Sequence, residues 1–446
     1  MIKFTKLFIT VLLAITVFQV RAQSTATTSN PYSQFGLGEI DQLALPQTIG
    51  MGGLGAAINN FSGFYNLNPV NPASYGSLRL TVIDIGIEGS DQVFSQTGQA
   101  SQANGNFKLS HVAFAFPVSK HSAISFGLQP YSEVGYNYIK TKKNFGTGSS
   151  VDTSAVNYIY SGEGGLSKAY FGYGINIGKH LLIGANVSYI FGNLHQYQST
   201  EIPTLFSTID SRVEDSYAIR GLNYDYGAQY TVDLTDTKHV ILGYSGSANN
   251  SINSQHKNIV SQYTYDSDGN ENAASDTLST TTDPTTKIKL PQINRFGLTF
   301  VNDNKFLIGA EYSTSSWSDL TIGGINQGLQ NSKTYNLGGQ ITPDINALSD
   351  YLKTVDYRLG FIYNQGYVNI ANPNGVGGTS INSEAITLGL GLPLRPGLNN
   401  SYYKINFAME IGREGTLVNG LVRENYINFH LSFSLNDKWF TQYKLN

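Results

Sequence analysis

The chain has 446 residues and not one cysteine. This absence excludes a disulfide scaffold, a thiolate metal site and a cysteine nucleophile. Charged residues are scarce at 13 %, about half of their usual share. The net charge is −3, so the basic surplus that nucleic-acid-binding proteins carry is also missing. We therefore expect no nucleic-acid partner and no metal or cofactor that depends on cysteine.

Long apolar runs are missing after the first 22 residues. The stretch from Leu7 to Val20 is mostly apolar, follows Lys3 and Lys6, and leads to a cleavage pattern at Ala22. It is short for a membrane span and has the layout of a secretory signal, so residues 1–22 are predicted to be a signal peptide. No later run reaches roughly 18 apolar residues, so no transmembrane helix is expected.

What the chain does have is tyrosine, phenylalanine and glycine, at 29, 23 and 47 residues. From Ile427 to Leu435 every second residue is apolar, and the residues between them are Asn, His or Ser. The segments Ile83–Ile87 and Ile405–Ile411 alternate in a similar way. This period of two is typical of a strand with one face toward lipid and the other toward a polar lumen.

The alternation recurs along the chain and predicts an all-β fold, an antiparallel transmembrane β-barrel of about 14 strands. The predicted strands are 80–88, 107–118, 123–138, 166–178, 181–195, 217–230, 238–246, 293–301, 305–316, 334–341, 355–366, 384–392, 402–413 and 425–435.

The predicted links between the strands alternate in length. Short links at 119–122, 178–180 and 302–304 are interleaved with long polar ones at 139–165, 196–216, 247–292, 317–333 and 367–383. Short periplasmic turns and long extracellular loops are typical of outer-membrane barrels. We therefore expect the outer membrane of a Gram-negative cell, with both termini in the periplasm. The link at 342–354 is long for a periplasmic turn and is expected to hold a helical turn.

The segment 23–78 precedes the barrel, which is predicted to span 79–446. It has no strong alternation but contains apolar residues that need a place to pack, and the lumen of a 14-stranded barrel has room for them. Its stretch Gly50-Met51-Gly52-Gly53-Leu54-Gly55-Ala56 and the later Asn71-Pro72-Ala73-Ser74 resemble the N-terminal hatch of the FadL family. The opening NPYSQFGLGE and the closing SLNDKWF are similar to FadL-like barrels of Bacteroidetes-type bacteria.

The resemblance implies a 14-stranded barrel plugged by a hatch that includes Gly50, Gly52, Gly53, Gly55, Asn71, Pro72 and Ala73. It also implies uptake of long-chain fatty acids or other hydrophobic compounds, which leave sideways through a kink in one strand. Glycine bends strands, so the pairs Gly172/Gly174 and Gly338/Gly339 are candidates for the kink. Glycine that faces a crowded lumen is the commoner explanation.

Charges of both signs are predicted to face the lumen. They include Asp84, Glu88, Arg295, Glu311, Arg358 and Glu410. A porin that selects ions of one sign would have a lining of one sign. The mixture favours side chains that bond one another or the hatch, and hence a plugged barrel.

Catalytic motifs give little support to an enzyme. Gly50 to Gly55 fits the spacing of a dinucleotide-binding loop, but no strand leads into it and the first acid after it is Asp84. The seven histidines are scattered, and no nucleophile motif is present. We expect a protein that is not an enzyme and has neither cofactor nor metal.

Two functions remain open at this point. The first is uptake of hydrophobic compounds, with outer-membrane lipid and a small hydrophobic ligand as partners. The second is an accessory barrel of an outer-membrane secretion or barrel-assembly complex, with other envelope proteins as partners. The polar loop 247–292 offers no obvious apolar groove, which favours the second.

Overall fold

The computed structural model describes residues 28–60, 64–146, 154–203, 209–265, 276–373, 375–394 and 401–439. The predicted signal peptide at 1–22 lies outside these residues. No described helix is long and apolar enough to cross a membrane.

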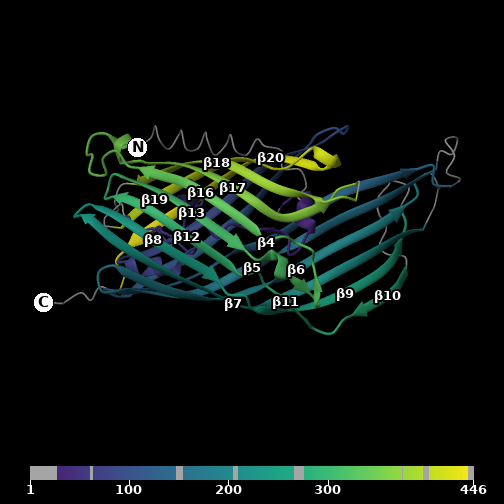
Figure 1. Cartoon of the computed structure of the whole chain (residues 1–446), viewed down its shortest axis with the longest axis horizontal. Coiled ribbons are helices and arrows are strands. Elements are labelled where there is room, and N and C mark those ends of the chain that lie inside the picture. Colours follow the sequence, from purple (N-terminus) through teal and green to yellow (C-terminus); the bar gives the residue numbers. More distant parts are fainter. Residues whose placement is uncertain are drawn as a thin grey trace, which may run out of the picture.

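Fourteen antiparallel strands form a closed barrel, as the sequence predicts (Figure 1). In order around the wall they are β2 (Thr81–Gln96), β3 (Gln102–Ser119), β4 (Ser122–Lys143), β5 (Ala155–Ile177), β6 (Leu181–Glu201), β7 (Asp210–Thr235), β8 (Lys238–Ser247), β12 (Ile293–Asn302), β13 (Phe306–Ser315), β16 (Ser332–Ile341), β17 (Asp356–Ala371), β18 (Gly378–Leu394), β19 (Tyr402–Gly415) and β20 (Val422–Asp437). Pairing of β20 with β2, from Thr81 opposite Asp437 to Gln96 opposite Val422, closes the ring. Every predicted strand coincides with one of these fourteen.

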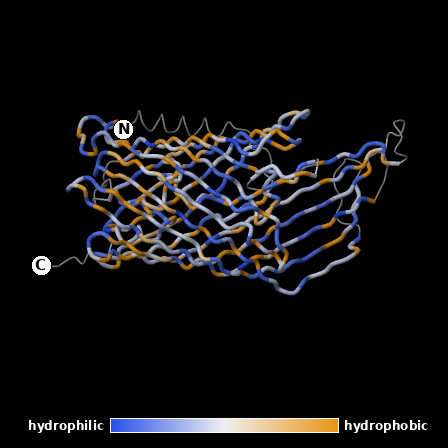
Figure 2. Tube along the Cα trace, in the orientation of Figure 1, coloured by the Kyte–Doolittle hydropathy of each residue, from blue (hydrophilic) through white to orange (hydrophobic). Residues whose placement is uncertain are grey.

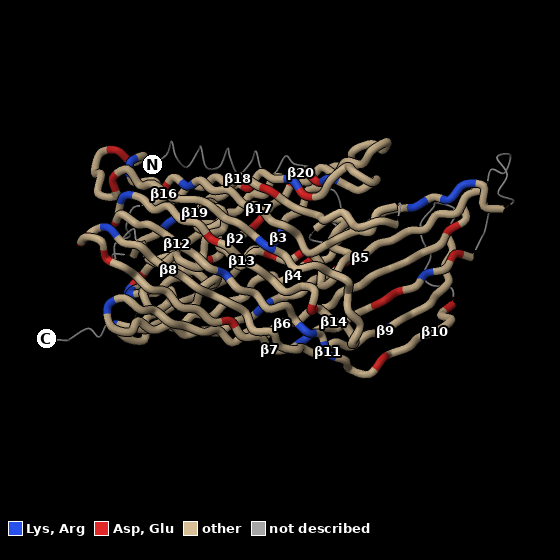
Figure 3. Tube along the Cα trace, in the orientation of Figure 1, with Lys and Arg blue, Asp and Glu red and all other residues tan. Residues whose placement is uncertain are grey.

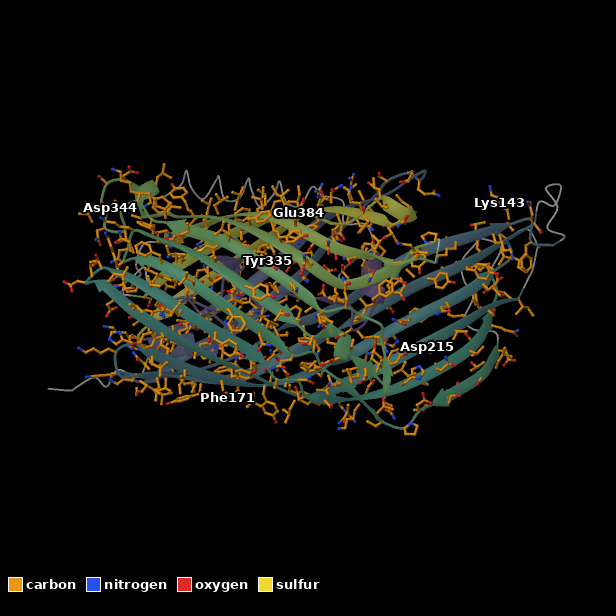
Figure 4. All side chains as sticks on the ribbon, viewed as in Figure 1. Lys143, Phe171, Asp215, Tyr335, Asp344 and Glu384 are labelled. Carbon is orange, nitrogen blue, oxygen red and sulfur yellow. The ribbon has the colours of Figure 1, made fainter. Side chains whose placement is uncertain are left out.

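The outer face of the wall carries the apolar half of the alternation. Leu298, Leu337 and Leu359 are each more than half exposed, whereas their neighbours Thr299 and Arg358 are buried inside. Figure 2 shows the apolar and polar residues alternating along the strands of the barrel. Figure 4 shows the Phe171 and Tyr335 side chains on the wall. An apolar surface of this extent around a closed barrel suits a lipid bilayer.

The wall is much taller on one side than on the other. Strands β4 to β7 have 22, 23, 21 and 26 residues, whereas β8, β12, β13 and β16 have 10 each. At roughly 3.3 Å per residue, β7 is about 85 Å long and β12 about 33 Å. The long strands continue past the barrel and form what we call the extension (Figure 1). β9 (Ser251–Tyr263) and β10 (Asp276–Thr282) continue it beyond β7.

The predictions of loops at 139–165 and 196–216 were therefore wrong, because most of these residues continue the strands. The reason is that the residues of the extension do not alternate in hydropathy, so the pattern did not mark them as strands. In Figure 3 charged residues mark the extension at the right and the turns at the left end. Lys143 and Asp215 lie in the extension, and Asp344 lies in a turn at the opposite end (Figure 4).

The shorter elements lie at the rims and inside the barrel. They are the 3₁₀ helices η1 (Pro31–Gln34), η2 (Pro72–Ser77), η3 (Trp317–Asp319), η4 (Tyr351–Thr354) and η5 (Val418–Gly420), the helix α2 (Pro46–Ile49), and the strands β1 (Glu39–Ile40), β11 (Thr286–Lys289), β14 (Thr321–Ile322) and β15 (Ile325–Asn326). The helical turn expected at 342–354 is present as η4.

One histidine of the extension is held by two carboxylates. The His256 Nδ1 atom lies 2.7 Å from Asp283 and the Nε2 atom 2.9 Å from Asp215, and the ring stacks on Tyr217. Partial burial lowers the pKa of His256, but the hydrogen bonds to Asp283 and Asp215 outweigh it and raise the pKa above the usual 6.5. The protonated ring therefore stabilises this part of the extension.

We expect this stabilisation to depend on pH. Because the folded pKa is raised, it is complete below about pH 6.5 and is lost as the pH rises through the folded pKa. Hydrogen exchange of β9 amides, corrected for intrinsic rates, should show weaker protection at high pH. His256→Gln should remove the pH dependence. If the protection of the wild-type β9 amides did not change with pH, protonated His256 would not be what stabilises the extension.

Candidate functional site

Residues 28–60 and 64–78 lie inside the barrel, and we call them the lumen segment. Its helix α2 begins at Pro46 and runs into the turn Gly50–Gly53, where Gly52 and Gly53 both have φ of +73°. Glycine adopts this left-handed conformation without strain. Asn336 of the wall donates to the Gly52 carbonyl at 2.6 Å, and Thr387 accepts from its N–H at 2.9 Å. The glycine-rich stretch is thus bonded directly to the wall.

Glu311 of β13 holds the end of this turn. One of its carboxylate oxygens accepts from the N–H of Gly55 at 2.8 Å and from the N–H of Ala56 at 2.7 Å. The carboxylate is buried, at 7 % exposure. Two charge-assisted hydrogen bonds to one carboxylate are among the stronger polar contacts in a protein. They fix the glycine-rich turn to one height of the wall.

The motif Asn71-Pro72-Ala73-Ser74 forms a cap at the start of the helix η2. The Asn71 side chain accepts from the Ala73 N–H at the start of η2, and its amide donates to the carbonyls of Ala56 and Tyr244 at 2.6 and 3.2 Å. Pro72 stands at the first position of η2, where no N–H is needed. Asn71 therefore ties both motifs of the lumen segment to each other and to β8.

Glycines of the inner wall let the lumen segment approach closely. A Cβ atom on Gly360 would overlap the backbone of Met51 and Gly52, and one on Gly338 would overlap the Met51 carbonyl. Residues Gly172, Gly174, Gly184, Gly243, Gly297 and Gly389 meet the same segment. Strand glycines mark such close approaches of another backbone. Of the four candidates for a strand kink, Gly172, Gly174 and Gly338 thus face a crowded lumen, and Gly339 lies against Leu307 of the wall.

Of the charges predicted for the lumen, Asp84, Glu311, Arg358 and Glu410 are buried, and most of the set is bonded. Asp84 contacts His111 at 2.7 Å and also Ser434. Arg358 donates to Asp356, Gln340 and Asn406, and Lys404 contacts Asp356 at 2.8 Å. Glu410 accepts from Tyr426 at 2.8 Å. Arg295 and Glu88 line the remaining space beside Glu311 and Lys108, respectively.

The wall is split between β3 and β4. Their pairing covers only Val112–Ser119 with Ser122–Leu128, and the rest of β3 pairs with β2 alone. On the other side of β4, its pairing with β5 continues, with a register shift between Pro130 and Ser132. β1 of the lumen segment takes the vacant place, with Glu39 opposite Glu133.

Lys108 bridges this split. Its ammonium lies 2.6 Å from Asp41 of the lumen segment, 2.8 Å from Glu133 of β4 and 3.8 Å from Glu88 of β2. Lys108 belongs to β3. It therefore joins β3 to β4, with which β3 does not pair at this height, and to the lumen segment that fills the space between them. Nothing in the sequence pattern marked the split, Lys108 or Asp41.

A cavity of about 340 Å³ remains between the lumen segment and the strands β2, β3, β4, β12, β13 and β16 to β20. Most of its lining residues are polar, and its acids are Glu39, Asp41, Glu88, Glu133, Glu311, Glu410, Glu414 and Glu424. The alternation placed Glu88, Glu311 and Glu410 toward the lumen. The other acids lie in the lumen segment or where the pattern fades. No group of three described His, Asp or Glu side chains is placed to hold a metal ion.

Comparisons with known proteins give one family and one fold. The family model described as BamG matches residues 1–446. The toluene transporter TodX of P. putida is 14 % identical, with a TM-score of 0.58, over 90 % of this chain and 100 % of its own. The monoaromatic hydrocarbon channel CymD is 13 % identical, with a TM-score of 0.53, over 91 % of this chain and 100 % of its own.

A FadL homologue of Pseudomonas aeruginosa is 13 % identical, with a TM-score of 0.54, over 91 % of this chain and 99 % of its own. No curated protein matches the chain. At these identities the likeness shows that the chain shares the FadL-like barrel fold.

Proposed function

The chain belongs to the BamG family, and from this premise we propose that it is an accessory barrel subunit of an outer-membrane secretion or barrel-assembly complex. The barrel lies in the outer membrane of a Gram-negative cell, with lipid around it and both termini in the periplasm. The observation that supports this most is the lumen, where Glu311, Thr387 and Asn336 bond the lumen segment to the wall. Residues 23–78 then act as a hatch that stays in place.

The remaining cavity fits a carrier of apolar compounds poorly. Sites for apolar ligands are lined mainly by aliphatic and aromatic side chains. Here the lining is mostly carboxylates, amides and hydroxyls, including Glu410, Asn428 and Ser383. An apolar solute would have to displace water from these groups without replacing their hydrogen bonds, which costs free energy.

The extension offers surface for a protein partner. A transmembrane strand needs only about 9–11 residues, and β7 has 26. The surplus strands cross no lipid, so their two polar faces are available for contacts outside the membrane.

Uptake of hydrophobic compounds, such as long-chain fatty acids, is the second candidate. Two observations favour it: the fold shared with hydrocarbon channels, and the split between β3 and β4 at the height of the cavity. In this case the hatch moves, Lys108 releases Asp41, and the solute leaves through the split into lipid.

The two candidates differ in what accompanies the protein. We expect gentle detergent extraction from the native outer membrane, followed by native mass spectrometry, to give a complex with other envelope proteins at fixed stoichiometry and no bound fatty acid. The matched control is the same extraction after a wash in high salt and harsher detergent, which should release the barrel alone. Recovery of a lone barrel with a bound fatty acid or hydrocarbon would overturn the accessory role in favour of uptake.

A further inference from the structure

We propose that the lumen cavity is a binding site for a linear polyamine, held by its ammonium groups among Glu39, Glu414 and Glu424. This inference does not depend on the proposed function, because an accessory subunit and a carrier have the same cavity. Its support comes from the positions of these carboxylates, from two buried groups without a partner, and from the polar lining.

The three carboxylates converge from different parts of the chain. Glu414 of β19 and Glu424 of β20 are directly opposite each other in the strand pairing. Glu39 lies on β1 of the lumen segment and lines the same cavity. Like charges directly opposite on neighbouring strands repel each other, and a buried anion without a counter-charge is costly. A bound cation would therefore stabilise this cluster.

Neutral donors reach this cluster, but no described cation does. Thr28 donates to Glu39 at 2.8 Å, Asn30 to Glu414 at 2.9 Å and Gln92 to Glu424 at 2.8 Å. Among the described residues, no lysine or arginine nitrogen lies within 4.0 Å of these three carboxylates. Lys108, which also lines the cavity, is engaged by Asp41 and Glu133.

Two side chains of β20 that line the cavity have buried polar atoms without a hydrogen-bond partner. One oxygen of Glu424, which is 2 % exposed, accepts no hydrogen bond. His430 is 5 % exposed, and neither of its ring nitrogens has a hydrogen-bond partner, although one lies 3.6 Å from Glu88. Both residues line the cavity. Buried polar groups are normally satisfied, so both open positions point to a ligand.

The positions of these groups favour an elongated ligand. Glu424 and His430 lie on the same face of β20, and six residues of strand span about 20 Å. Glu410 of β19 is opposite Asn428, between the two. An ammonium group donates three hydrogen bonds and accepts none, which matches carboxylate oxygens and a histidine nitrogen. A ligand with amines spaced along a chain can place one ammonium at Glu414 and Glu424 and another at Glu410, about 13 Å along the strand, which a single small cation cannot.

Other ligands fit less well. A metal ion needs three or more closely placed ligands, and the described residues provide no such group. A hydrocarbon would cover Ser90, Asn106 and Asn364 without replacing their hydrogen bonds to water. The alternative without a ligand is that the carboxyls take up protons and that water fills the cavity. The experiment has to separate this alternative from amine binding.

The test uses the full-length protein in nonionic detergent and measures binding of spermidine by isothermal titration calorimetry. We expect saturable binding at one site, with affinity falling from spermidine to putrescine to butylamine at matched ionic strength. Glu424→Gln and Glu414→Gln should each weaken binding by about tenfold or more, because each removes a charge-assisted hydrogen bond. Glu384→Gln, which removes an exposed carboxylate paired with Arg413, is the matched control and should bind like the wild type.

The absence of saturable binding to the wild type would overturn the proposal in favour of protonated carboxyls and water. Equal affinity of the wild type and Glu424→Gln would also overturn it, since binding would then occur elsewhere. Heat-modifiable gel migration checks that each variant is folded. A second measurement needs no variant: with a carbodiimide, spermidine should couple to Glu414 or Glu424 before Glu384, and the reverse order would contradict the site.

Discussion

Asp356→Ala is expected to lower the free energy of unfolding of the barrel by about 3–5 kcal/mol. Asp356 is 1 % exposed at the start of β17, and it accepts from Arg358 at 3.0 Å, from Lys404 at 2.8 Å and from Thr342 at 2.7 Å. Its removal leaves two buried cations without their shared anion. Urea unfolding in detergent, followed by gel migration of unheated samples, measures the loss.

The control for this prediction is an ion pair of the same kind on the surface. Glu384→Ala removes the partner of Arg413, and both side chains are well exposed. Exposed pairs contribute at most about 1 kcal/mol, so this variant should unfold close to the wild type. Similar losses in the two variants would mean that burial does not strengthen the contacts of Asp356.

Gly360→Val is expected to expel the glycine-rich turn from its place on the wall. A Cβ atom at residue 360 would overlap backbone atoms of Gly52 and Met51, which cannot rotate away as a side chain can. The turn must shift, so Glu311 loses its bonds to Gly55 and Ala56. We expect a loss of about 3 kcal/mol or more and ion conductance across planar bilayers, where the wild type conducts little.

Gly89→Val is the matched control. Atoms nearest to a Cβ at Gly89 are 3.8 Å away, an ordinary contact, so valine fits there. This variant and the wild type should both stay closed to ions and should both resist proteinase K within the lumen segment. If the Gly360→Val barrel neither conducts ions nor loses its resistance to proteinase K, the lumen segment tolerates a shift. The close approach of Met51 and Gly52 to Gly360 would then not be what keeps the barrel closed.

The barrel could be predicted because each membrane-spanning strand has one face toward lipid and the other toward the polar lumen. Ile427 to Leu435 alternates since one face meets lipid and the other meets the lumen, and the predicted strand agrees with β20. Residues 139–165 and 196–216 were misread because the residues of the extension do not alternate between apolar and polar. The hydropathy pattern identifies a strand only where its two faces differ.

The sequence predicts which charged side chains face the lumen, but not which residues they bond. Alternation placed Glu311 and Arg358 on the inner face, but it does not say that Glu311 bonds Gly55 or that Arg358 bonds Asp356. Such partners are set by strand order and register around the whole ring. Lys108 and Glu424 belong to the same class, since their roles depend on the lumen segment around β1, which is far away in the sequence.

The lumen segment also bears on the order in which the molecule is assembled. It stands at the N-terminal end of the described chain, yet Tyr32 bonds Val422, Asn30 bonds Glu414 and Tyr65 bonds Asn436. These partners lie about 370 to 390 residues later, and contacts at such separations form late because the chain between them must first be ordered. The lumen segment is thus synthesised before the strands of the barrel but takes its final place after them. Its binding to the wall shows that β19 and β20 have joined the ring.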